Sequence, residues 1–201
     1  MHHRLRNRFP GLAALLLAAV PCLAADDPHA HHRQMIQPGY TRSVQDYRAP
    51  DLKLIRDDGV SVAVPSLLNT DRPVVVSFIY TSCTAICPLL TATIAQARKN
   101  LGPDAERVRI VSVTIDPDYD TPARLRDYAR QFQAGGEWRF FTGDRATIVA
   151  MQKAFNSYRG DKNDHAPLTL VRPAGQSRWV RLEGFTSAEV LATEIKRKPG
   201  V

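Results

Sequence analysis

Apolar runs and helix-like stretches alternate along most of the chain. Residues 73–80 and 108–115 are two runs rich in Val and Ile in which no two polar residues are adjacent. That pattern is typical of strands buried on both faces of a sheet. Residues 88–101 lie between the two runs, carry helix-favouring side chains and end at a Gly-Pro pair. Strands that alternate with helices imply an α/β fold, in which helices flank a partly parallel central sheet.

The rest of the chain continues this alternation. Thr121, Asp144 and Ser187 are suited to cap three further helices, which we expect over residues 121–134, 144–155 and 187–197. Short strands are expected at residues 138–141, 168–171 and 178–183. Upstream, residues 52–55 and 60–64 flank an Asp-Asp-Gly turn, which predicts an N-terminal β-hairpin before the first buried strand.

The N-terminus has the pattern of a secretory signal peptide. Residues 1–9 contain three arginines and no acid, residues 12–20 are uninterruptedly apolar, and small residues precede an acidic pair. We therefore expect cleavage near Ala24 and a periplasmic, extracytoplasmic location. The apolar stretch of residues 11–25 is shorter than the roughly 20 residues of a spanning helix, which disfavours an uncleaved membrane anchor. Acylation at Cys22 is a further alternative, disfavoured by the Val-Pro pair before it.

Three segments follow from these patterns. Residues 1–24 are the expected signal peptide, residues 25–48 a flexible tail, and residues 49–201 a single domain. The tail is polar and has no clear period. It contains His29, His31 and His32, which are either incidental or a loose metal-binding tract.

Composition agrees with one ordinary globular domain. The chain has 201 residues, of which 44% are hydrophobic and 23% charged, and this excludes a disordered chain or a disulfide-dense mini-protein. The formal net charge is +7, and signal cleavage would remove three arginines and lower it to +4. Because the remaining basic residues are interleaved with acids, no nucleic-acid partner is expected.

Two cysteines carry the candidate chemistry. Cys83 and Cys87 lie on the loop between the buried strand at 73–80 and the helix at 88–101, with Pro88 suited to the first helical position. The unpaired N–H groups at a helix N-terminus favour thiolate over thiol. Three functions remain open for this pair: a permanent disulfide, a redox dithiol or a metal site. A disulfide across so short a loop would add little stability.

One histidine lies in the body of the domain. His165 precedes the strand expected at 168–171, and it is either a structural residue or a third metal ligand. Two thiolates and one imidazole would suit copper, because structural zinc sites and iron–sulfur clusters generally use four protein ligands.

Three motifs together resemble the SCO/SenC family. The stretch from Tyr80 to Pro88 resembles the family's Cys-x-x-x-Cys-Pro loop. Residues 112–122 are similar to its strand that ends in Asp-Pro-x-x-Asp-Thr-Pro, and Asp164-His165 matches its Asp-His before a late strand. The hairpin before the cysteines also fits, so that the resemblance covers residues 51–196.

The resemblance implies a thioredoxin-like fold and a role in handling copper. It implies that Cys83, Cys87 and His165 are copper ligands, and it leaves open whether the bound ion is Cu(I) or Cu(II). The implied function is a monomeric copper metallochaperone that serves the dinuclear copper site of cytochrome c oxidase, by delivering copper or by reducing the site's cysteines. Such a protein needs no enzyme activity, but it needs a thiol reductant partner. Asp116 and Asp120 are better interpreted as loop-shaping residues than as ligands.

Two departures from the family keep other functions open. Many relatives keep a transmembrane anchor, and the stretch after His165 is compressed here. Pro167 at the start of the late strand resembles the cis-proline that faces the dithiol of thioredoxins, which favours a thiol–disulfide oxidoreductase that uses Cys83 and Cys87 without metal. A copper-tolerance module that relies on the histidines of the tail is a third alternative.

Overall fold

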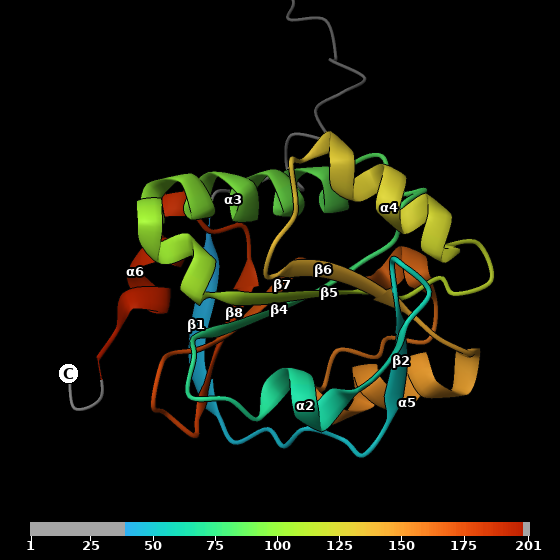
Figure 1. Cartoon of the computed structure of the whole chain (residues 1–201), viewed down its shortest axis with the longest axis horizontal. Coiled ribbons are helices and arrows are strands. Elements are labelled where there is room, and N and C mark those ends of the chain that lie inside the picture. The colour runs from blue at the N-terminus through green and yellow to red at the C-terminus, as the bar shows by residue number, and fades with distance from the viewer. Residues whose placement is uncertain (1–38, 199–201) are drawn as a thin grey trace, which may run out of the picture. The chain divides into compact units, whose positions relative to one another are not determined.

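The computed structural model describes residues 39–198 and has a mixed sheet at its centre (Figure 1). In this part of the chain the sheet has eight strands in the order β1-β8-β7-β4-β5-β6-β2-β3. The strands are β1 (Tyr40–Gln45), β2 (Lys53–Arg56), β3 (Ser61–Ala63), β4 (Val74–Ile79), β5 (Arg109–Thr114), β6 (Trp138–Thr142), β7 (Leu168–Arg172) and β8 (Trp179–Gly184). The helices are α2 (Val64–Leu68), α3 (Ile86–Leu101), α4 (Pro122–Gln131), α5 (Arg145–Ala154) and α6 (Ala188–Lys196), with short 3-10 helices at Gly102–Arg107 and Lys162–Asp164.

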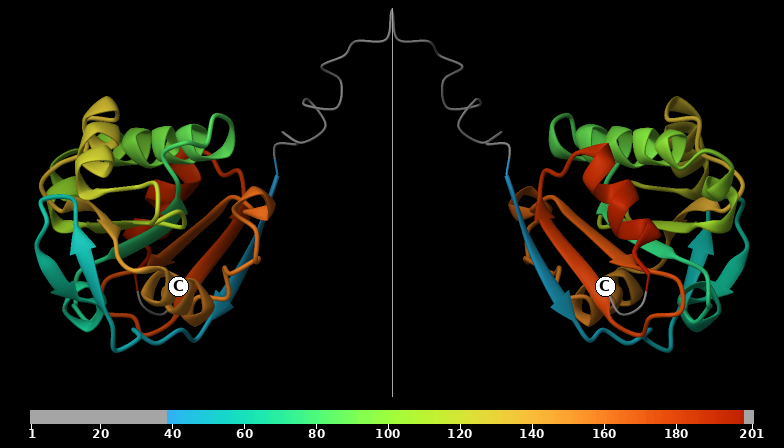
Figure 2. Two further views of the ribbon diagram at one scale, coloured as in Figure 1. Left: turned by 90° about the vertical axis from the view of Figure 1, so that its right-hand side faces the viewer. Right: turned by 90° about the vertical axis from the view of Figure 1, so that its left-hand side faces the viewer.

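Helices cover both faces of the sheet. Helices α3 and α4 lie over one face and α2 and α5 over the other (Figure 1), while α6 packs beside α3 (Figure 2). Each layer has its own buried core: Ile94, Leu125 and Leu191 belong to the core under α3, α4 and α6. Leu68 and Met151 belong to the core on the α2 and α5 side. Both cores are formed by residues far apart in the sequence that the fold brings together.

The two central strands are the ones that the apolar runs predict. All six residues of β4 are buried, and β4 pairs in parallel with β5 and antiparallel with β7. The buried serines of these strands have hydrogen-bond partners. Ser77 Oγ and Ser112 Oγ lie 2.9 Å apart, and Trp138 Nε1 of the neighbouring strand β6 donates to Ser112 Oγ at 3.0 Å. Strand β4 lies in the middle of the strand order. The loop that follows its C-terminal end therefore leaves from the middle of the sheet edge.

The expected tail is wrong for residues 40–45. They form β1, which pairs antiparallel with β8 along its whole length. Arg42 anchors this strand, because its guanidinium donates to the buried carboxylate of Glu194 on α6, with Nε and Oε1 2.7 Å apart. The signal peptide and the histidines expected before residue 39 lie outside the described residues. Within residues 39–198, no helix is long and apolar enough to cross a membrane.

Several helix ends differ from the sequence-based expectation. Helix α3 begins at Ile86, two residues early, so that Cys87 lies within its first turn. Pro88 is tolerated there because the first N–H groups of a helix have no intrahelical acceptor. Residue 64, expected at the end of a strand, instead begins α2, with Pro65 at its second position. Strands β2 and β3 pair antiparallel across the turn at Gly59.

Candidate dithiol and metal site

The two cysteines lie where β4 ends and α3 begins. The Cys83 N–H donates to Tyr80 O at 3.2 Å, which folds the loop back toward the strand. Cys83 is half-buried, whereas Cys87 is completely buried, and both are free thiols. The backbone N–H of Cys87 donates to Cys83 Sγ at 3.4 Å. The Cys83 sulfur therefore caps the helix N-terminus, an environment that stabilises negative charge on it.

The environments of the two thiols push their pKa values apart. Partial burial opposes ionisation of Cys83, but hydrogen bonds from the backbone N–H groups of Cys87 and Ala85 outweigh it and lower the Cys83 pKa below its ordinary value. Burial raises the pKa of Cys87 strongly, and the nearby charge of Cys83 adds to this effect. Cys83 is thus the sulfur that ionises first, while Cys87 holds its proton until a metal or an electrophile engages the pair.

A buried carboxylate fixes the cysteine loop. Asp120 is completely buried and accepts hydrogen bonds from the Thr81 backbone N–H at 3.0 Å, from the Thr81 hydroxyl and from the Thr114 hydroxyl. Thr81 belongs to the loop after β4, and Thr114 is the last residue of the neighbouring strand β5. Asp120 therefore joins the end of β5 to the start of the cysteine loop after β4, the loop-shaping role expected from the sequence.

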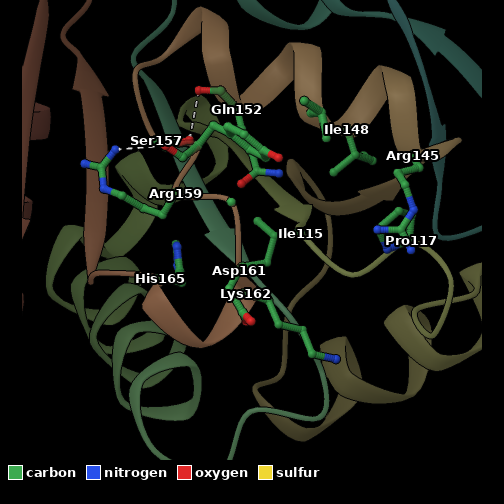
Figure 3. Close-up of a pocket in the computed structure, with 13 residues that line it drawn as sticks. Ile115, Pro117, Arg145, Ile148, Gln152, Ser157, Arg159, Asp161, Lys162 and His165 are labelled. Carbon is green, nitrogen blue, oxygen red and sulfur yellow. Dashed lines mark hydrogen bonds between the residues drawn. The ribbon is translucent and has the colours of Figure 1, made fainter.

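His165 is buried beside the C-terminal end of β4, against a cavity that the cysteines do not line. Its Nε2 lies 2.9 Å from the carbonyl oxygen of Phe78, so Nε2 carries a proton and donates, and Nδ1 keeps its lone pair. Burial lowers the pKa of His165 and keeps the imidazole neutral. The ring lies against a cavity of about 100 Å³, which we call the His165 hollow, whose other walls include Ile115, Gln152 and Lys162 (Figure 3).

The structure brings the two cysteines together but does not bring His165 to them. Cys83 lines a separate, larger depression of about 480 Å³, here called the Cys83 hollow, and shares no lining residue with the His165 hollow. Within residues 39–198, no three His, Cys, Asp or Glu side chains gather closely enough to hold a metal ion. The three ligands implied by the resemblance are therefore not assembled in this arrangement.

The segment that carries His165 nevertheless adjoins the cysteine loop. Lys162 Nζ lies 5.5 Å from the centre of the Tyr80 ring and 2.5 Å from Asp116 Oδ2. Burial, together with the neighbouring Cys83, raises the pKa of Tyr80 to about 12. His165 itself is bound to Phe78 of β4, the strand that leads into the cysteine loop. The imidazole and the dithiol thus flank the same strand end.

Two further residues support the dithiol and were not found from the sequence. The Thr91 hydroxyl donates to Cys87 O at 2.7 Å, and the Tyr128 hydroxyl lies 3.0 Å from Thr91 Oγ1. Because the Thr91 hydroxyl already donates its one proton to the carbonyl of Cys87, the Tyr128 hydroxyl is the donor to Thr91 Oγ1. Thr91 lies one turn after Cys87, a spacing that could have suggested this contact, whereas nothing local marks Tyr128.

Pro167 differs from the cis-proline it was compared with. Residues 39–198 contain no cis peptide bond, so the bond before Pro167 is trans. The Pro167 carbonyl accepts from the Gly184 N–H at 2.9 Å, which continues the pairing of β7 with β8. The sequence left the isomer of this bond open, and the structure has it trans, unlike the cis-proline of thioredoxins.

Comparison with known proteins places the chain among SCO proteins. The SCO1/SenC family model matches residues 44–197. The chain is 31% identical over 140 residues to a SCO1 protein homolog of Bacillus subtilis, covering 69% of this chain and 67% of that protein. Its fold resembles Bradyrhizobium japonicum ScoI with copper bound, with a TM-score of 0.61 and 25% identity over 74% of this chain and 98% of that one. It also resembles BsSco, described as a member of the Sco family of cytochrome c oxidase assembly proteins, with a TM-score of 0.64 and 22% identity over 77% of this chain and 94% of that one. The expected thioredoxin-like fold, a mixed sheet flanked by helices, is confirmed.

Proposed function

Because this chain belongs to the SCO1/SenC family, we propose that it is an extracytoplasmic copper metallochaperone. It binds one copper ion through Cys83, Cys87 and His165 and delivers it to the dinuclear copper site of cytochrome c oxidase, or prepares the thiols of that site. The observation that carries the proposal is the paired, reduced dithiol at the N-terminus of α3. The copper-bound ScoI structure, which shares this fold, supports copper as the cargo.

The chemistry of the dithiol suits a soft monovalent ion. Thiolates are the preferred ligands of Cu(I), and the N-terminus of α3 offsets part of their negative charge. Cys83 is the first donor because its pKa is lowered, and copper must then displace the proton of Cys87. His165 would join the sulfurs through Nδ1, the nitrogen that keeps its lone pair while Nε2 donates to Phe78 O, and the segment that carries it has to bring the ring to the dithiol.

The need for free thiolates determines which partner and which compartment suit the chaperone. A Cys83–Cys87 disulfide has no thiolate to offer, so the chaperone depends on a thiol reductant partner in an oxidising compartment. The signal-like N-terminus supports a periplasmic location. We propose that the chain acts as a monomer and hands copper to a cuproprotein by stepwise exchange of ligands.

A second candidate function is a thiol–disulfide oxidoreductase. The observation that favours it is the asymmetry of the pair: Cys83 is the accessible sulfur with the lower pKa, and Cys87 is buried behind it. An attacking thiol and a resolving thiol require this arrangement. A copper-tolerance role for His29, His31 and His32 concerns residues outside the described part of the chain.

The redox state of the pair provides the test. In anaerobic Cu(I) competition titrations, we expect one tight equivalent in the reduced chain and none after the two cysteines are oxidised to a disulfide. The reason is that oxidation removes both soft donors at once while leaving His165 in place. Equal copper binding before and after oxidation would mean that the dithiol is not the copper site.

A further inference from the structure

We propose that the Cys83 hollow is the docking surface for an acidic, cysteine-bearing polypeptide segment of the partner protein. The inference rests on the proposed function, since it concerns what reaches Cys83, and it applies to copper transfer and to thiol exchange alike. It is carried by the shape of the hollow, the position of the reactive sulfur in its wall and the charges around its rim.

The hollow is large enough for a polypeptide segment and opens beside the reactive sulfur. Its volume is about 480 Å³, between the first turn of α3 and helix α4, which lie on the same face of the sheet (Figure 1). Thr81, Cys83 and Pro88 form one wall, and Tyr119, Arg124 and Tyr128 contribute to the other. Cys83 is partly exposed and lines the hollow, so a partner ligand that enters the hollow meets its side chain.

One side of the hollow presents an exposed aromatic and a cation. Tyr119 is 45% exposed, and the Arg124 guanidinium stacks on its ring with Cζ 3.7 Å from the ring centre. Tyrosine and arginine are the residue types that dominate the energetics of protein interfaces. An exposed pair of this kind at the mouth of the hollow is better suited to a polypeptide than to a small thiol.

The charged residues around the hollow indicate which charge a partner segment should carry. Residues 81–97, which include the cysteine loop and most of α3, contain no charged side chain. Two charged side chains of α4 line the hollow, Arg124 and Asp127, and the carboxylate of Asp127 is paired with Arg130 on the same helix. Within residues 39–198, no carboxylate forms a salt bridge with Arg124. The unneutralised charge at the rim is therefore positive, and an acidic segment is the complementary partner.

The exchange chemistry gives a direct assay for docking. The probe is a short acidic peptide with one cysteine between two leucines, held in a mixed disulfide with 2-nitro-5-thiobenzoate. The Cys83 thiolate attacks the peptide sulfur and releases the coloured thiobenzoate. Cys87 then loses its proton to solvent and attacks the Cys83 sulfur, which releases the peptide thiol and leaves a Cys83–Cys87 disulfide. A second probe has lysines in place of the acidic residues.

The experiment compares the two probes on the full chain carrying Cys22→Ser, so that Cys83 and Cys87 are the remaining thiols. Each rate is divided by the rate with hydroxyethyl disulfide, which reports the intrinsic reactivity of Cys83. We expect the acidic probe to react roughly tenfold faster than the basic one at low salt, with the advantage shrinking as salt is added. Arg124→Glu should remove this preference, and Tyr119→Ala should slow both probes.

Arg126→Glu is the matched control, because Arg126 lies on α4 with the same charge but does not line the hollow. It should keep the preference for the acidic probe. Equal normalised rates for the two peptides, or the same loss from Arg126→Glu as from Arg124→Glu, would overturn the docking surface. Cu(I) binding by the same variants is measured separately: a chain that prefers the acidic probe but binds no Cu(I) retains the docking surface and loses the metallochaperone function.

Discussion

Replacing either cysteine with serine is expected to abolish tight Cu(I) binding. The hydroxyl oxygen of serine is a hard, protonated donor, whereas Cu(I) prefers soft thiolates. By analogy with other thiolate-rich metal sites, the loss of one such ligand should weaken binding by about a hundredfold or more. Competition titration of the reduced variants Cys83→Ser and Cys87→Ser against a Cu(I) chelator measures this loss.

Ser82→Ala is the matched control for these variants. Ser82 is exposed on the same loop, next to Cys83, and supplies no soft donor. It should bind Cu(I) as the wild type does. Wild-type affinity in either cysteine variant would show that the copper ion is held elsewhere, and the metallochaperone model would have to be abandoned for this dithiol.

Loss of the Asp120 carboxylate is expected to destabilise the domain and loosen the dithiol. Asp120→Ala leaves the Thr81 N–H and the hydroxyls of Thr81 and Thr114 without their shared buried acceptor. Unpaired buried donors of this kind cost about 2–4 kcal/mol in the free energy of unfolding. Urea denaturation measures the change, and the thiol–disulfide equilibrium of the pair should shift as the loop loses its anchor.

Asp118→Ala serves as the comparison for this variant. Asp118 is also an aspartate of the loop after β5, but it is exposed and pairs with the exposed Arg145. Exposed ion pairs contribute little to stability. The two variants should therefore differ clearly, and equal stabilities would mean that the buried hydrogen bonds of Asp120 do not hold the loop.

The sequence predicts the parts of the fold that depend on local pattern. Strands β4 and β5 are almost entirely buried, which leaves runs rich in Val and Ile in which no two polar residues are adjacent. The capping side chains are equally local: Thr121, Asp144 and Ser187 each accept from the N–H three residues on, as expected. Strand β1 was missed because it lies at an edge of the sheet and is mostly exposed, and its residues show no apolar run.

The site was predictable only as far as its chemistry is local in sequence. Cys83 and Cys87 are four residues apart at a strand–helix junction, and that junction does place them together. The partner of His165 is the carbonyl of Phe78, 87 residues away, and no sequence pattern specifies such a contact. The burial of Asp120 and its hydrogen bonds to Thr81, 39 residues away, are likewise a product of tertiary packing.

The role of His165 is the central claim, because it separates the metallochaperone from a simple oxidoreductase. The decisive measurement is an anaerobic Cu(I) competition titration of reduced residues 39–201, which include both buried cores and omit the histidine tail. Wild type is compared with His165→Ala and with Gln152→Ala, which alters the same hollow without removing a ligand. We predict one tight equivalent, weakened about tenfold or more by His165→Ala and unchanged by Gln152→Ala. The absence of a tight site, or one indifferent to His165, would contradict the account and favour the oxidoreductase.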